Sequence, residues 1–360
     1  MLRYFETRTR IIVLVAVGAS FAALLLRLGG AAGVATFAAS AVGLAGLAAL
    51  VGEGTTQLAH RLGPKATGVL QSALGNLPEF FIGIFALRAG LLDVVRAALV
   101  GSILANTLLV LGLAFLAGGL RHGPQRFGTD QTKMISTLLV LAAAAIAIPT
   151  VAASPGGPAH GHETELSVVV SLVLLVVFVA SIPFSIGTGP GISSLDGADG
   201  SEPAWPLALA AATLLAAGVG AAFVSDWFVD ALKPAMSSLG MSESFAGLVV
   251  VAIAGNAVEN VVGVQAMLKD KGDLAISVIL NSSLQVALAL APVLVLTSLV
   301  LGGATLTLVV SPLLVAALAL TAVLSALVVI DGESTWLEGL ALIGLYVILA
   351  ASVWWGSPIG

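Results

Sequence analysis

The chain has 360 residues, of which 59% are hydrophobic and only 9% are charged, and its formal net charge is −5. Because a soluble globular protein carries about a quarter charged residues, this composition excludes a soluble protein and indicates an integral membrane protein in a lipid bilayer. The chain has no cysteine, which excludes disulfides and thiolate metal sites. It also has no basic cluster that would suggest a nucleic-acid partner.

Eleven apolar stretches follow one another, each near the length of about 20 residues that a helix needs to cross a bilayer. The alternation of a transmembrane β-barrel is missing, so the sequence predicts an all-α membrane protein. The basic start of the chain resembles a signal peptide, but no clear cleavage site follows, and we expect a retained first helix. The expected spans are 11–26, 33–59, 66–87, 93–118, a fifth that ends at Pro149, 166–186, 204–232, 244–268, 273–301, 306–330 and 336–355.

Residues 187–203 form the only clear break in composition. They are rich in Gly and Ser, they contain no Lys or Arg, and their acids are Asp196, Asp199 and Glu202. The sequence therefore predicts four parts, which are the N-terminus and first helix over 1–32, a five-helix repeat over 33–186, an acidic cytoplasmic linker over 187–203, and a second five-helix repeat over 204–360.

Positively charged residues predict the orientation of the chain. With the N-terminus inside, ten of the fourteen Lys and Arg residues fall on the inner side, and the others are Arg27, Arg88, Arg96 and Lys233. We therefore expect a cytoplasmic N-terminus and an external C-terminus, and the short loops favour a prokaryotic cell membrane. Five spans in each half would make the halves enter from opposite sides. Such inverted repeats are typical of secondary transporters with a site at the bilayer midplane.

One short motif occurs in both halves. Gly75-Asn76-Leu77-Pro78-Glu79 recurs 180 residues later (255 − 75) as Gly255-Asn256-Ala257-Val258-Glu259. Each copy places a carboxylate and an amide inside an apolar run, where a charge is costly and usually functional. The same offset matches Gly83 with Gly263, Asp93 with Asp273 and Ser102 with Ser282. This register predicts an internal repeat.

Helical spacing predicts that Ser72, Asn76, Glu79 and Gly83 share one face. Pro78 has no N–H, so the carbonyl of Leu74 is expected to lose its helical donor and to be free for a ligand. We expect Glu79 and Glu259 to bind the metal and the protons, with neutral oxygens from Asn76, Asn256, Ser102 and Ser282. Possible further residues are Asn106, Ser283, Gln285, Leu74, Glu53 and Asp226. The competing interpretation is that the polar groups only join helices; for Asp226 it is a solvated helix end instead of a cation entrance.

These ligands are all oxygens, which favours Ca²⁺ or another hard cation over softer metals. Two carboxylates can balance one divalent cation, and burial without it favours their protonated form. The sequence therefore predicts that Ca²⁺ and protons compete for one site. Ca²⁺ is the transported ion, and we expect no cofactor. The oligomeric state cannot be predicted from these patterns.

The residues also resemble a known family. Gly75-Asn76-x-x-Glu79, followed by Gly101-Ser102-x-Leu104-x-Asn106, is similar to the first signature of the calcium/proton exchangers in the cation/calcium exchanger superfamily. The second signature is resembled by Gly255-Asn256-Ala257-x-Glu259, Lys269-x-Lys271-x-Asp273-Leu274-Ala275 and Ser282-Ser283-x-Gln285. The resemblance covers nearly the whole chain from the second span. It implies Ca²⁺ export driven by inward protons, with Glu79 and Glu259 at the centre.

The chain departs from this family at three positions. The family has an acid late in the second span, where this chain has Thr56, although Glu53 lies one turn earlier on a similar face. Asn260 stands where His is usual, and Asn281 stands where Gly is usual. These departures bear on ion preference and on the proton path more than on the fold.

Other functions remain as alternatives. A Na⁺-driven Ca²⁺ exchanger or a monovalent cation/H⁺ exchanger of the same superfamily has the same architecture. A cation channel would not need one midplane acid in each inverted half. An enzyme is not expected, because the sequence has no HExxH, no GxSxG and no Asp pair at the spacing of a zinc site or protease.

Overall fold

The computed structural model describes residues 5–30, 33–188 and 205–355, and within these it describes only the backbone of 59–73, 130–131, 183–188 and 258. The chain forms two compact units. The first unit contains Met1–Phe85, Ser181–Met241 and Ala254–Val258, and the second contains Ala86–Ala180, Ser242–Ile253 and Glu259–Gly360. The predicted acidic linker, with Asp196, Asp199 and Glu202, lies almost entirely outside the described residues.

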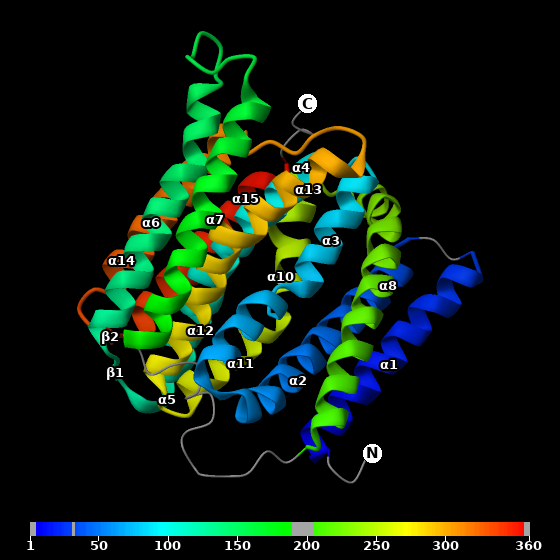
Figure 1. The fold of residues 1–360 in the computed structure, drawn as a ribbon, viewed down its shortest axis with the longest axis vertical. Helices are drawn as coiled ribbons and strands as arrows, with labels where there is room; N and C mark the ends of the chain where they lie inside the picture. The colour runs from blue at the N-terminus through cyan, green and yellow to red at the C-terminus, as the bar shows by residue number, and fades with distance from the viewer. Residues whose placement is uncertain (1–4, 31–32, 189–204, 356–360) are drawn as a thin grey trace. The chain divides into compact units, whose positions relative to one another are not determined.

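Three long helices build the first unit, which are α1 (Thr7–Leu28), α2 (Val34–Leu74) and α8 (Leu207–Leu239). Both α1 and α8 pack against α2, and the three run side by side in Figure 1. The rings of Phe37 on α2 and Phe228 on α8 stack with centroids 4.8 Å apart. At the end of α1, Arg27 forms ion pairs with Asp226 at 3.2 Å and with Asp230 at 2.7 Å on α8. The first part of α3 (Leu77–Arg88) completes this unit.

The second unit holds most of the remaining helices. Its elements are α4 (Leu92–Leu104), the π-helix η1 (Ala105–Val110), α5 (Leu111–His122), β1 (Gln125–Arg126), α6 (Thr129–Ala152), α7 (Glu163–Thr188), α9 (Glu243–Phe245), the π-helix η3 (Ala246–Val251), α10 (Ala252–Gly255), α11 (Ala257–Leu268), α12 (Gly272–Gln285), the π-helix η4 (Val286–Leu290), α13 (Ala291–Leu301), α14 (Pro312–Val328), β2 (Glu333–Ser334) and α15 (Trp336–Trp354), with the ends of α7 and α10 in the first unit. Within it α4 packs on η3, α5 on α15, and α6 on both α12 and α14.

The helices suit a bilayer. Within the described residues, eight are long and apolar enough to cross a membrane, and a ninth counts if Glu243–Gly255 and Glu259–Leu268, bent by 62°, form one broken span. Large apolar side chains such as Leu14 on α1 (72% exposed) and Val176 on α7 (69% exposed) face outward, as lipid-facing residues do. The chain is thus a helical integral membrane protein, although α14 has only 17 residues, and the expected eleven spans are not all present as separate long helices.

The predicted loop between the spans 33–59 and 66–87 is wrong. One continuous helix, α2, runs through this stretch to Leu74, and the interruption falls at Gly75 and Asn76 before α3. Glycine and asparagine favour turns, and Pro78, which has no N–H to donate, fits the first turn of a helix better than its interior. The basic residues after 59 had suggested a membrane boundary, but charge alone does not end a helix.

Several element bounds recur at an offset of 180 residues. Helix α3 covers 77–88 and α11 covers 257–268, while α4 begins at Leu92 and α12 at Gly272. The π-helix η1 ends at Val110 and η4 ends at Leu290. The offset that the motifs have in the sequence is therefore also present in the secondary structure.

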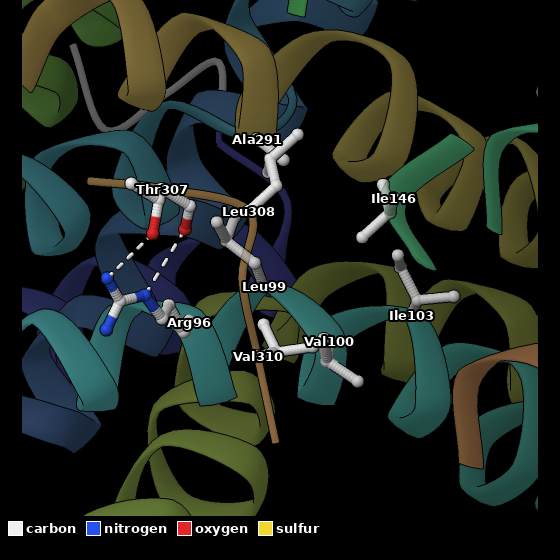
Figure 2. A pocket seen from close by; sticks show the side chains of 9 residues that line it. All are labelled: Arg96, Leu99, Val100, Ile103, Ile146, Ala291, Thr307, Leu308 and Val310. Atoms are coloured by element: carbon white, nitrogen blue, oxygen red, sulfur yellow. Dashed lines mark hydrogen bonds between the residues drawn. The ribbon is translucent and has the colours of Figure 1, made fainter. Parts of the chain in front are cut away.

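Polar contacts gather at the two ends of the second unit. At one end β1 pairs antiparallel with β2, Arg126 forms an ion pair with Glu333 at 2.9 Å, and the backbone N–H of Gly128 donates to Asp273 Oδ1 at 2.5 Å. At the other end, Arg96 near the start of α4 donates to the hydroxyl and the carbonyl of Thr307, at 3.0 and 3.2 Å (Figure 2).

Thr307 belongs to an extended segment over 302–311, where the sequence predicted the start of a helical span. Helix α14 begins only at Pro312, after the N-cap Ser311. The segment's backbone N–H groups are satisfied by hydroxyls on three helices, with Leu306 bound to Ser298, Leu308 to Ser167 and Val310 to Thr150. These side chains replace the helical hydrogen bonds that the backbone lacks, so the segment needs no regular partner strand.

Candidate cation site

Both copies of the motif interrupt a helix. Leu74 ends α2, Gly75 and Asn76 form a turn, and α3 begins at Leu77. In the second copy α10 ends at Gly255, Asn256 is the turn, and α11 begins at Ala257. Helix ends leave carbonyls and N–H groups without helical partners, so each interruption offers backbone groups to a ligand.

The two glutamates occupy matching places. Glu79 is the third residue of α3 and Glu259 is the third residue of α11. A carboxylate in the first turn of a helix is stabilised by the positive end of the helix dipole. Glu79 is only 7% exposed, and Glu259 is partly buried. The predicted face of Ser72, Asn76, Glu79 and Gly83 is wrong, because the break at residues 75–76 places Ser72 on a different helix.

The first unit joins Glu79 to the second motif copy. Asn256, which is fully buried, donates from Nδ2 to Glu79 Oε1 at 2.5 Å across 177 residues of sequence. Gly255 makes this approach possible, since a Cβ at that position would stand 2.5 Å from Glu79 Cγ and 3.0 Å from Oε1. Sequence analysis selected Glu79 and Asn256 separately and did not predict that they meet.

The second unit joins two further predicted residues. Asn106, fully buried in η1, donates from Nδ2 to Ser282 Oγ on α12 at 3.0 Å. Ser102 lies on α4 one turn before Asn106 and is also buried. Ser283 is buried too, but its hydroxyl donates to the carbonyl of Ile279 in its own helix at 3.3 Å.

The remaining predicted residues have different surroundings. Asn76 lies in the turn before α3, and Leu74 ends α2, where the last carbonyls of a helix lack donors. Gln285 ends α12 directly before η4, and Glu53 is partly buried on α2. Asp226 is 40% exposed and ion-paired with Arg27. Thr56, which replaces the usual acid, donates to the carbonyl of Gly52 at 3.0 Å.

The chemistry of this set is that of oxygen ligands. Within the described part of the chain, no three His, Asp or Glu side chains converge on a common point. A cation would therefore be bound by few carboxylates together with amide, hydroxyl and carbonyl oxygens, which is the ligand preference of Ca²⁺.

Comparisons with known proteins give the family. The profile of the sodium/calcium exchanger protein family matches residues 32–187 and 209–355. A Ca²⁺/H⁺ antiporter of Synechocystis sp. is 35% identical over 322 residues, with 84% of this chain and 86% of the relative covered. The Ca²⁺/H⁺ antiporter ChaA of Bacillus subtilis is 33% identical over 319 residues, covering 87% and 90%.

Solved structures agree with this assignment. The structure of native YfkE is similar with a TM-score of 0.82 at 29% identity, covering 95% of this chain and 99% of that one. The H⁺/Ca²⁺ exchanger CAX shares the fold with a TM-score of 0.73 at 15% identity, covering 96% and 92%. The matched relatives are antiporters and not enzymes. The chain therefore belongs to the sodium/calcium exchanger protein family, and the relatives it matches include Ca²⁺/H⁺ antiporters.

Proposed function

We propose that this chain exchanges Ca²⁺ for protons across a prokaryotic cell membrane, and that both ions compete for Glu79 and Glu259. The names of the relatives support the reaction. The observation that carries the assignment to these residues is the hydrogen bond from Asn256 to Glu79 at 2.5 Å, because it brings one carboxylate and the amide of the other motif copy to the same place.

Charge balance explains the competition. Two ionised carboxylates neutralise one Ca²⁺, and two protons neutralise the same pair when the cation leaves. A site with both carboxylates ionised and empty is costly at low dielectric, so the protein changes conformation readily only when the site is filled by one of the two ions. This condition couples the two fluxes.

Neutral oxygens complete the coordination of Ca²⁺, which takes six to eight ligands. We assign this role to Asn76, Asn256, Ser102 and Ser282, with Asn106, Ser283, Gln285 and the carbonyl of Leu74 as further candidates. Glu53 is assigned to the cytoplasmic approach to the site, and Asp226 to the opposite approach, where Arg27 is its ion-pair partner.

The transport cycle that we propose is alternating access between two inverted five-helix repeats. The recurrence of element bounds at an offset of 180 residues supports the repeat. The excess of Lys and Arg on one side of the predicted topology supports a cytoplasmic N-terminus and an external C-terminus.

The test is Ca²⁺ uptake into proteoliposomes under an imposed pH gradient, with wild type, Glu79→Gln and Glu259→Gln. Glutamine keeps the size of the side chain and removes the charge. We expect gradient-dependent uptake in wild type and a loss of at least about 100-fold in both variants, since each removes a charged ligand. Glu165→Gln is the matched control, because Glu165 is 71% exposed near the start of α7.

Other results have clear meanings. Uptake that ignores the pH gradient but follows a Na⁺ gradient would replace the proton with Na⁺ as the coupled ion. Uptake that persists in both Gln variants would contradict the role of the paired carboxylates. Uptake that needs no gradient coupling at all would indicate a channel.

A further inference from the structure

Asn260 directly follows Glu259 on α11. The residue is partly exposed, but its Oδ1 is buried and has no hydrogen-bond donor among the described residues. A buried acceptor without a donor is destabilising, so this oxygen calls for a partner that is not part of the polypeptide.

The face of α11 that carries Asn260 is turned toward the second unit. Gly263 and Met267 lie three and seven residues further on and share this face. A Cβ on Gly263 would stand 2.6 Å from Ile279 Cγ1 on α12 and 3.7 Å from Val110 Cγ1 in η1. The Asn260 side chain thus projects from a packed helix face.

Helix register fixes the level of Asn260 relative to α12. Only residues 269–271 separate α11 from α12, and the two helices run antiparallel. Going back one turn on α11, from Gly263 to Asn260, therefore corresponds to going forward one turn on α12, from Ile279 to Ser282.

The contacts with η1 and α5 give the same level. Val110 lies against Gly263, and Gly118 lies against Met267, so this chain segment runs in the same direction as α11. One turn back from Val110 is Asn106, whose amide donates to Ser282. Asn260 therefore lies at the height of the Asn106–Ser282 pair and next in sequence to Glu259.

We propose that Asn260 determines cation specificity by contributing its Oδ1 as a further neutral ligand to the cation bound at Glu259. This inference rests on the proposed function. An amide oxygen keeps the site composed of oxygen alone, which suits Ca²⁺. A histidine at this position would add an imidazole nitrogen, a ligand that suits Ni²⁺ and Zn²⁺.

The experiment compares wild type, Asn260→Ala, Asn260→His and Asn260→Asp in the full chain. Proteoliposomes give the KM and maximal rate of Ca²⁺ uptake and its inhibition by Ni²⁺, and titration of the purified proteins with CaCl₂ gives the binding constant. Asn281→Ala is the control, because Asn281 donates only to Ser277 within α12, at 3.1 Å.

We expect Asn260→Ala to raise the KM and the Kd for Ca²⁺ roughly tenfold with little change in maximal rate, as for loss of one ligand to a charged group. Asn260→Asp, which retains the oxygen, restores binding, and Asn260→His increases inhibition by Ni²⁺ at least about tenfold. A purely structural role would lower the maximal rate and the amount of folded protein instead.

The inference is overturned if wild type exchanges Ca²⁺ and the Ala and His variants keep its Ca²⁺ affinity and its sensitivity to Ni²⁺. It is also overturned if the Asp variant binds Ca²⁺ as poorly as the Ala variant. Wild type that binds Ca²⁺ through Asn260 but shows no uptake driven by a pH gradient contradicts the proposed function and leaves the ligand assignment standing.

Discussion

Gly255 controls how closely the carboxylate of Glu79 approaches the backbone of the second motif. Its backbone lies where a side chain would meet Glu79 Cγ at 2.5 Å. The next residue, Asn256, donates the hydrogen bond that fixes Glu79 Oε1. Two adjacent residues thus set the position of one carboxylate, one through the absence of a side chain and the other through its amide.

Replacement of Gly255 by alanine should therefore move Glu79. The added methyl group displaces the carboxylate and lengthens the bond from Asn256, so we expect Ca²⁺ uptake to fall at least about tenfold while the protein still folds. Uptake in proteoliposomes and elution as a single species measure the two effects. Gly344→Ala on α15, where no atom lies within 4 Å of an added Cβ, is the control and should transport normally.

A normal rate in Gly255→Ala would mean that the position of Glu79 is not set by this close approach. The sequence was sufficient to single out Glu79 and Asn256, because charged and amide groups are conspicuous in apolar runs. It could not predict their hydrogen bond, since contact across 177 residues depends on packing. The pairing of Arg27 with Asp226 was missed for the same reason.

Ser167 connects helix α7 to the extended segment 302–311. Its hydroxyl donates to the carbonyl of Glu163 at 2.6 Å and accepts from the backbone N–H of Leu308 at 3.0 Å. Ser171 lies one turn further on the same helix and is equally buried, but no described residue is a hydrogen-bond partner of its hydroxyl. The two serines form a matched pair for measuring what this connection contributes.

We expect Ser167→Ala to destabilise the protein by about 1–3 kcal/mol, because it leaves the N–H of Leu308 buried without an acceptor. Ser171→Ala should change the stability by less than about 0.5 kcal/mol. Thermal unfolding in detergent measures both. Equal melting temperatures for the two variants would show that the segment is held by its other contacts alone.

The elements themselves were only partly predictable. Long apolar runs gave the helices of 93–118 and 273–301 almost to the residue, because burial in lipid favours an unbroken helix. The extended segment 302–311 was missed, because its apolar residues look like the start of a span and its hydroxyl partners are distant in sequence. The π-helices leave no signal in apolar periodicity and were not expected.

The orientation of the whole chain can be read from one helix. Lys133 lies near the start of α6 and Ser154 lies just past its end, and both are exposed. The chain has no cysteine, so a single introduced thiol is the only reactive one. In intact cells we expect a membrane-impermeant maleimide to label Ser154→Cys, and to label Lys133→Cys only after permeabilisation.

The reverse labelling pattern would place the N-terminus outside. The membrane class and the family could be predicted from composition and two spaced motifs, and the family match has confirmed them. The number of spans and the inverted relation of the halves remain predictions, since they depend on which helices cross the bilayer completely.

The π-helices have a consequence for the history of the chain. A π turn contains one residue more than an α turn and arises most simply from a single-residue insertion. Because η1 and η4 end at the same offset, the insertion preceded the doubling of the chain if both halves descend from one ancestor. The equivalent of η3 falls at 66–71, within the α-helix α2, so by the same reasoning that irregularity belongs to one descendant only.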